Sequence, residues 1–240
     1  MNGNVVVTGA DRGLGLAVAS QLAEAGWRVF AGQFKPDWPE LGEAEARLSG
    51  LTAVPMDVQS QDSVVKSVER VRDQVDRIDV LINNAGVNSL SRTQTIRDGL
   101  DYDELHRLYN TNSVGPLRVV EAYLPLMEKS EMKRLCFVSS EAGSVKNAHR
   151  DAWYSYGMSK SALNMGVKIL FNYLRSDGYT FRLFHPGGIQ SYIGGTDTKG
   201  QPKSREAAEA AVPAIEYFLR NVENEDELVL RDWKGEVLPW

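Results

Sequence analysis

"VVVTGADRGLGLAVASQLAEAG", residues 5–26, joins three kinds of segment in a fixed order. A short β-branched run comes first, a turn containing Gly9, Gly13 and Gly15 follows, and an amphipathic segment of helical period ends the stretch. Glycines in such a turn let the backbone approach a phosphate closely, and the helix that follows aims its unpaired N–H groups at the anion. The stretch therefore predicts a strand, a turn and a helix that bind the phosphate of a nucleotide.

The spacing of the three glycines distinguishes this turn from two other phosphate-binding loops. No Gly-Lys-Ser/Thr sequence follows it, so it is not a Walker loop. Its pattern, G-x-x-x-G-x-G, also differs from G-x-G-x-x-G. For the loop taken alone, an ordinary turn whose glycines serve only packing stays an open alternative.

The alternation of strand-like and helical segments continues along the whole chain. Short β-branched or apolar runs occupy residues 5–7, 28–31, 52–56, 80–82, 135–138, 181–184 and 228–230. Amphipathic stretches of helical period occupy residues 14–25, 63–75, 102–127, 159–174 and 204–219. Nearly continuous apolar strands indicate burial on both faces, and their alternation with helices indicates a parallel sheet between two helical layers. We expect one doubly wound α/β domain over residues 1–240, with Pro36 and Pro39 in a loop after the second strand.

The composition limits the classes of partner. The chain has 240 residues, a formal net charge of −5 and one cysteine, Cys136, which lies in an apolar run. The acidic balance argues against a broad nucleic-acid surface, and no apolar run approaches the roughly 18 residues of a membrane span. The N-terminus lacks the pattern of a signal peptide, and no histidine or cysteine cluster has the spacing of metal ligands. We expect a cytoplasmic protein with no metal, nucleic-acid or membrane partner.

The end of the second strand favours one nucleotide over another. In dinucleotide sites an acidic residue about 20 positions after the glycine loop binds the adenosine ribose, whereas a nearby arginine accommodates a 2′-phosphate. Here the neutral Gln33 stands at that position, and Arg12 and Lys35 supply positive charge. The pattern favours NADP(H) over NAD(H), with Asp37 as the alternative carboxylate if the loop is shifted.

A second group of polar residues lies in YSYGMSK, residues 154–160. Tyr156 and Lys160 are four positions apart and share one face of a helix, whereas Tyr154 falls on another face. Hydride transfer to a carbonyl leaves an alkoxide that needs a proton, and a phenol, with a usual pKa of about 10, donates one poorly unless a cation lowers that pKa. We expect Tyr156 to be the proton donor and Lys160 to lower its pKa. A buried helix face without chemistry is the alternative.

Several further motifs, in chain order, carry a family resemblance. They are TGADRGLG at 8–15, PMDVQ at 55–59, NNAG at 83–86, NTNSVGPL at 110–117, FVSSEAG at 137–143, YSYGMSK at 154–160 and HPGGIQS at 185–191. Together they resemble the classical short-chain dehydrogenases/reductases, which have a three-layer Rossmann-type fold. The resemblance runs from residue 4 to about residue 195 and implies a hydride-transferring enzyme.

The resemblance implies a role for each matching residue. The catalytic set is Asn112, Ser140, Tyr156 and Lys160. Ser140 would hydrogen-bond the substrate oxygen, Asn112 would hold a water that relays protons to Lys160, and Lys160 would also hold the nicotinamide ribose. Ser139 is an alternative to Ser140, but neighbours on a strand face opposite sides, and Ser140 alone matches the motif. The expected cofactor contacts are Gly9, Arg12, Gly13, Leu14, Gly15, Gln33, Lys35, Asp57, Val58, Asn84, Ala85, Gly86, Tyr156, Lys160, Pro186, Gly187, Ile189 and Ser191.

Other features are similar to one subgroup, the C-factor and sniffer-type carbonyl reductases. Sixteen positions separate Ser140 from Tyr156, more than in many classical members, and the subgroup also shares SKSALNM at 159–165 and a C-terminal LPW. Residues 192–222 are expected to form a flap and helix over the substrate, with GGTDTKGQP at 194–202 as a loop.

We therefore expect an NADP(H)-dependent carbonyl reductase, acting on a small molecule as a homodimer or homotetramer. An NADP-binding signalling or scaffold protein is the main alternative, and a lyase or epimerase is a third.

Overall fold

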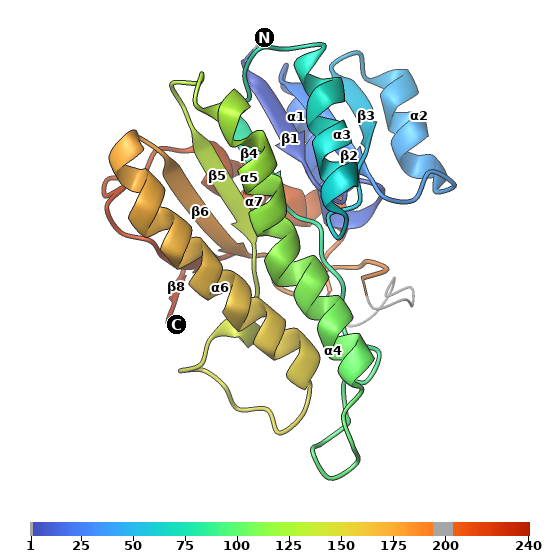
Figure 1. Ribbon diagram of the computed structural model, residues 1–240, viewed down its shortest axis with the longest axis vertical. Helices are drawn as coiled ribbons and strands as arrows, with labels where there is room; N and C mark the ends of the chain where they lie inside the picture. The colour runs from blue at the N-terminus through green and yellow to red at the C-terminus, as the bar shows by residue number, and fades with distance from the viewer. Residues whose placement is uncertain (1, 194–203) are drawn as a thin grey trace.

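One eight-stranded sheet forms the centre of the molecule in the computed structural model, which describes residues 2–193 and 204–240 (Figure 1). Its strands are β1 (Asn4–Val7), β2 (Arg28–Gln33), β3 (Leu51–Pro55), β4 (Val80–Asn83), β5 (Arg134–Val138), β6 (Thr180–His185), β7 (Leu230–Asp232) and β8 (Val237–Leu238). They lie in the order β3-β2-β1-β4-β5-β6-β7-β8, and every neighbouring pair is parallel except β7 with β8. The order reverses between β1 and β4, and in such sheets ligands bind outside the carboxyl ends of the strands at this point.

Helices cover both faces of the sheet. They are α1 (Gly13–Glu24), α2 (Pro39–Arg47), α3 (Gln61–Arg72), α4 (Tyr102–Tyr109), α5 (Gly115–Met127), α6 (Tyr154–Leu174) and α7 (Ala207–Leu219). Short helical turns occur at η1 (Asn110–Val114), η2 (Glu141–Gly143) and η3 (Arg175–Asp177). In Figure 1, α3, α5 and α6 lie in front of the sheet, and α7 lies behind it.

The two apolar cores follow from the alternation of side chains along each strand. In β1, Val6 packs in one core with residues of α3, α5 and α6. Val5 and Val7 point the other way and pack with residues of α1, α2 and α7. Successive strand residues face opposite sides of a sheet, so a continuous apolar run supplies both cores. The predicted doubly wound α/β domain is confirmed.

Several expected boundaries were wrong. The segment after β2 forms the helix α2, which begins at Pro39, a residue that is favourable in the first turn because its missing N–H is not needed there. The expected helix over residues 102–127 is divided by the π-helical turn η1. α6 begins at Tyr154 and not at Ser159. The last parallel strand is β7, at Leu230–Asp232, because its ladder pairs with the end of β6.

Candidate active site

The carboxyl edge of the sheet borders a cavity of about 910 Å³. Its walls contain most of the residues that the sequence singled out. These are Gly9, Arg12, Gly13, Leu14, Gly15, Lys35, Asp57, Val58, Asn84, Ala85, Gly86, Ser140, Tyr156, Lys160, Pro186, Gly187, Ile189 and Ser191. Segments that are far apart in the chain thus meet at the crevice that the strand order creates.

Two of the expected residues do not line this cavity within the described part of the chain. Gln33 ends β2, where its carbonyl accepts a hydrogen bond from the Met56 N–H at 2.7 Å. The next residues, Phe34 and Lys35, form the wall in its place. Asn112 is fully buried behind the wall. The expected loop at 194–202 lies outside the described residues.

The glycine loop is fixed to β4 by a set of hydrogen bonds. The Thr8 hydroxyl accepts from the backbone N–H groups of Asn84 and Ala85, each at 3.0 Å. The Asn84 side chain donates to the carbonyls of Thr8 and Gly9, also at 3.0 Å. A Cβ at Gly15 would lie 2.2 Å from the Gly9 oxygen, so only glycine fits there. Gly15 therefore lets the start of α1 pack closely against the Gly9 carbonyl and the Asn84 side chain.

Two cations lie at the β2 end of the cavity. The Arg12 guanidinium is 4.3 Å from the centroid of the Trp38 ring, a distance at which an aromatic face attracts a cation. Lys35 lines the cavity beside it. The one carboxylate of the glycine loop, Asp11, accepts from the N–H groups of Phe34 and Lys35 at 2.9 Å. Asp37, the alternative carboxylate, is exposed and does not line the described part of the cavity.

Ser140, Tyr156 and Lys160 come together on one wall. The side chain of Ser140 is close enough to Tyr156 to lower the pKa of its phenol, and the Ser140 hydroxyl accepts from the Ala142 N–H at 3.2 Å. The Lys160 ammonium lies 5.8 Å from the centroid of the Tyr156 ring and donates to the Val138 carbonyl at 3.0 Å. The alternative serine, Ser139, donates its hydroxyl to Asn164 at 2.6 Å. Of the two serines, Ser140 is therefore the one whose side chain acts on the tyrosine.

The pKa values of this group correct one expectation. Burial raises the pKa of Tyr156, and the Ser140 hydrogen bond and the charge of Arg92 only partly oppose that rise. Burial also lowers the pKa of Lys160 to about 8. The net pKa of Tyr156 is raised because burial outweighs the neighbouring charges, and the expected lowering by Lys160 stays a prediction. A phenol with a raised pKa stays protonated near neutral pH.

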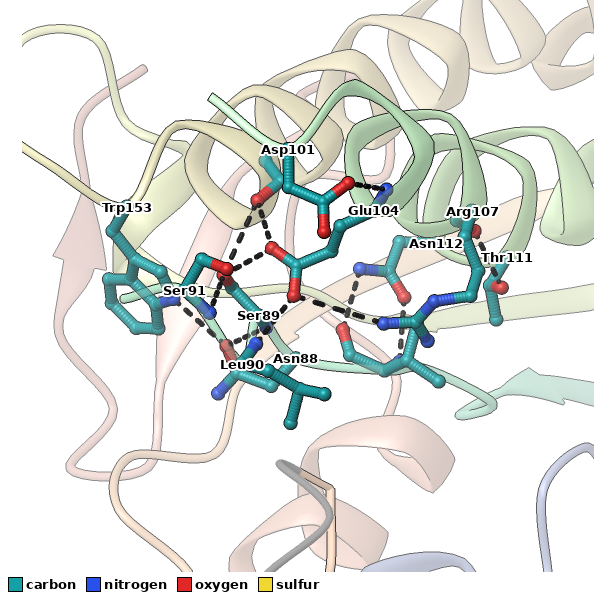
Figure 2. Close-up of polar contacts among 12 residues, drawn as sticks. Asn88, Ser89, Leu90, Ser91, Asp101, Glu104, Arg107, Thr111, Asn112 and Trp153 are labelled. Carbon is teal, nitrogen blue, oxygen red and sulfur yellow. Dashed lines mark hydrogen bonds and ion pairs between the residues drawn. The ribbon is translucent and has the colours of Figure 1, made fainter. Parts of the chain in front are cut away.

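The buried Asn112 side chain hydrogen-bonds both the loop after β4 and the helix α6. Its side-chain oxygen accepts from the Val87 N–H at 2.8 Å, and its side-chain nitrogen donates to the Val87 carbonyl at 2.9 Å (Figure 2). The same nitrogen donates to the Ser159 hydroxyl at 3.0 Å. Asn112 lies in the π-helical turn η1, a kind of turn that is frequent at functional sites. Its side chain thus links the loop after β4 to α6 next to Lys160.

Glu104 is a buried carboxylate that the sequence reasoning missed (Figure 2). It accepts from the Ser89 hydroxyl at 2.5 Å, the Leu90 N–H at 2.6 Å and the Ser155 hydroxyl at 2.9 Å. Burial raises the pKa of Glu104, but these hydrogen bonds outweigh it and the net pKa lies below the usual range. The sequence held one signal, since Asp101 caps α4 and a glutamate three residues later is typical of a capping box.

Trp153 forms an aromatic wall beside the tyrosine. Its ring stacks on Tyr156 with centroids 4.7 Å apart and planes inclined by 16°. The indole N–H donates to the Asn88 side chain at 2.9 Å (Figure 2). The backbone of Trp153 is left-handed, with φ of 70°, so its local structure is held by these tertiary contacts. Tyr154 does not line the described part of the cavity.

The described residues contain no group of three or more His, Cys, Asp or Glu side chains that could hold a metal ion. His185 ends β6 and lines the cavity, and burial lowers its pKa. None of the helices within residues 2–193 and 204–240 is long and apolar enough to cross a membrane.

Comparison with known proteins identifies the family. A family model described as short chain dehydrogenase matches residues 3–202. The chain belongs to the short-chain dehydrogenase family. As a member of this family, it is an oxidoreductase. The family resemblance seen in the sequence motifs is therefore confirmed.

Three similar proteins refine the comparison. C-signal of Myxococcus xanthus is 35% identical over 166 residues, which cover 68% of this chain and 93% of C-signal. An NADPH-bound carbonyl reductase from chicken fatty liver has a TM-score of 0.86 and 26% identity, covering 99% of this chain and 98% of that one. The carbonyl reductase Sniffer of D. melanogaster has the same fold, with a TM-score of 0.85 at 23% identity over the whole of both chains. The predicted likeness to the C-factor and sniffer-type subgroup is confirmed.

Proposed function

We propose that this family member reduces a carbonyl compound to an alcohol with NADPH as the hydride source. One observation carries the proposal: Ser140, Tyr156 and Lys160 lie on one wall of a cavity whose other end holds the cations Arg12 and Lys35. A reductase needs both parts, a proton donor at one end and a binding site for a phosphorylated nucleotide at the other.

The residues present fit NADPH. At the β2 end, Arg12 and Lys35 suit a 2′-phosphate, while the carboxylate of the glycine loop, Asp11, is bonded to backbone N–H groups. Gly13 has a positive φ of 59°, which suits glycine, and a Cβ there would be in van der Waals contact with the Ser191 side chain at 3.7 Å. The NADPH bound to the chicken carbonyl reductase supports the same cofactor here. When bound, NADPH supplies the hydride.

The chain's own residues would position the substrate and move a proton. The Ser140 hydroxyl would hold the carbonyl oxygen beside Tyr156, and the Tyr156 phenol would donate its proton to that oxygen. The raised pKa of Tyr156 favours this direction, because the phenol is protonated when the substrate arrives. Lys160, with a pKa of about 8, exchanges a proton readily near neutral pH and can restore the phenol. The water relay through Asn112 stays a prediction.

The test is a comparison of two tyrosines on one helix. Purified protein is mixed with NADPH and a panel of aldehydes, ketones and diketones, and the loss of NADPH absorbance is followed. Tyr156→Phe should abolish turnover while NADPH still binds, and Tyr154→Phe should keep most of the rate. Turnover of Tyr156→Phe within a few-fold of the unmodified protein would contradict the proposal, and tighter binding of NADH than of NADPH would contradict the cofactor.

A signalling role is the second candidate, supported by the 35% identity with C-signal. Its signature would be tight NADPH binding with no turnover of any carbonyl in the panel. In that case the search would move to partner proteins.

We also propose that two or more copies associate through α6 and that residues 192–222, of which 194–203 lie outside the described part of the chain, cover the substrate. Four apolar side chains of α6 are exposed, Met158, Met165, Ile169 and Tyr173, at 53%, 63%, 61% and 74%. Light scattering gives the mass in solution, and a monomer would contradict the association. The cytoplasmic location stays a prediction.

A further inference from the structure

The end of the cavity beyond Tyr156 carries an excess of positive charge. Three arginines line it, Arg92, Arg107 and Arg150, against one carboxylate, Glu141. The other acidic residues of the wall, Asp11 and Asp57, follow β1 and β3 at the opposite end. This imbalance lies where a substrate would sit and is not explained by the two cations at the β2 end.

Two of the three arginines already have carboxylate partners. Arg150 donates two N–H groups to the two oxygens of Glu141, at 2.5 and 3.2 Å. Arg107 lies 4.0 Å from the buried carboxylate of Glu104 (Figure 2). These contacts neutralise both guanidiniums in place.

Arg92 differs from the other two. It forms no ion pair with a described carboxylate. Its guanidinium lies 5.6 Å from the centroid of the Trp153 ring, which the paired Arg150 also approaches, at 5.1 Å. That ring stacks on Tyr156 and is fixed by Asn88, so the aromatic wall places Arg92 close to the reactive phenol. The charge of Arg92 also lowers the pKa of Tyr156, which agrees with this closeness.

The geometry points to Arg92 as the binding site for a carboxylate of the substrate, which makes the substrate an oxo acid with a planar apolar body. Its carbonyl would lie at Ser140 and Tyr156, its body against Trp153 and Leu90, and its carboxylate at Arg92. A guanidinium binds a carboxylate through two parallel N–H donors, and this contact fixes the orientation of a substrate as well as its affinity. In the reduction the hydride adds to the carbonyl carbon, the phenolic proton goes to its oxygen, and the carboxylate is unchanged. The inference rests on the proposed function and limits the substrates of that reaction to one class, the oxo acids.

A matched pair of ketones tests the inference. 4-Acetylbenzoate and 4-acetylbenzamide have nearly the same shape and differ in charge, and kcat/KM with NADPH is measured for both. We expect a preference for the carboxylate of roughly tenfold or more, as a hydrogen-bonded charge pair typically gives. Arg92→Gln should lose that preference, whereas Arg97→Gln, in the same loop but outside the cavity wall, should keep it. The ratio of the two substrates is decisive, because any effect of Arg92 on the Tyr156 phenol slows both alike.

An equilibrium measurement separates this inference from the proposed function. Calorimetric titration of both ketones into the protein with NADP⁺ reports binding without reduction. Reduction of the amide with no preference for the carboxylate, in rate or in binding, would overturn the inference and leave the reductase intact. Tighter, Arg92-dependent binding of the carboxylate with no reduction of either ketone would support the anion site and refute the reductase. If Arg92→Gln does not fold, Arg92→Lys, which keeps the charge without the paired donors, should show a preference reduced about threefold or more.

Discussion

Lys160→Met should make the cofactor-free protein more stable while it removes the proposed activity. The Lys160 side chain is only 3% exposed, and its ammonium has one hydrogen bond, to the Val138 carbonyl at 3.0 Å. It forms no ion pair with a described carboxylate. A charge buried with so few partners lowers the stability of the folded chain, and a methionine of similar length removes the charge and fills the same space.

The magnitude follows from the pKa. Burial lowers the pKa of Lys160 from 10.5 to about 8, and each unit corresponds to about 1.4 kcal/mol. Near pH 7 both the folded and unfolded chains hold the proton, so the charged side chain costs the folded state about 3 kcal/mol. Between the two pKa values the unfolded chain holds a proton that the folded chain has lost, so stability rises with pH. The advantage of Lys160→Met should therefore fall to roughly half by about pH 9.5.

The assay is urea unfolding of both proteins without cofactor, near pH 7 and near pH 9.5. Tyr123 and Cys136 also have raised pKa values through burial, but both proteins share them, so their effect cancels in the difference. Lys168→Met is the matched control, because Lys168 is exposed on the same helix, and its effect should stay within about 0.5 kcal/mol at both pH values. A Lys160→Met protein that is less stable than the unmodified one, or an advantage that does not change with pH, would refute the reasoning.

Three further substitutions or reactions test other parts of the structure. Glu104→Ala should lower the free energy of unfolding by about 3 kcal/mol near neutral pH, because the Leu90 N–H and two serine hydroxyls lose their acceptor. Folding lowers the pKa of Glu104, so urea unfolding should show this loss of stability at pH values above the ordinary pKa of 4.5. The loss should disappear as the pH falls through the pKa of Glu104 in the folded chain. Gly15→Ala should destabilise the folded chain by about 2 kcal/mol and abolish NADPH binding in a titration, because the added Cβ would lie 2.2 Å from a carbonyl oxygen. Gly42→Ala is the control: Gly42 lies in α2 with open space around it, so this substitution should stabilise the folded chain by about 0.5 to 1 kcal/mol. Cys136 is fully buried, and burial raises the pKa of its thiol to about 12. Iodoacetamide near pH 8 should therefore alkylate Cys136 only after the chain unfolds, which mass spectrometry would show. Rapid alkylation of the folded chain would contradict this prediction.

The sequence by itself determined the fold and the outline of the site. The glycine turn after β1 and the apolar runs of the strands are local patterns, and each needs only its own neighbours to be recognised. Because the carboxyl ends of parallel strands meet at one edge, the placement of the strands together with the family resemblance predicted that Ser140, Tyr156 and Lys160 share a cavity with the glycine loop. The roles of these residues remain proposals.

Only the tertiary structure decided the surroundings of those residues. Glu104 bonds Ser89 and Ser155, which lie 15 and 51 positions away, and no local pattern shows which hydroxyls will surround a carboxylate. The net shift of the pKa of Tyr156 likewise depends on how deeply the fold buries the phenol and on charges from other segments. A spacing rule gives the direction of a side chain along one element, whereas desolvation and charge act through space across elements that the chain brings together only when it folds.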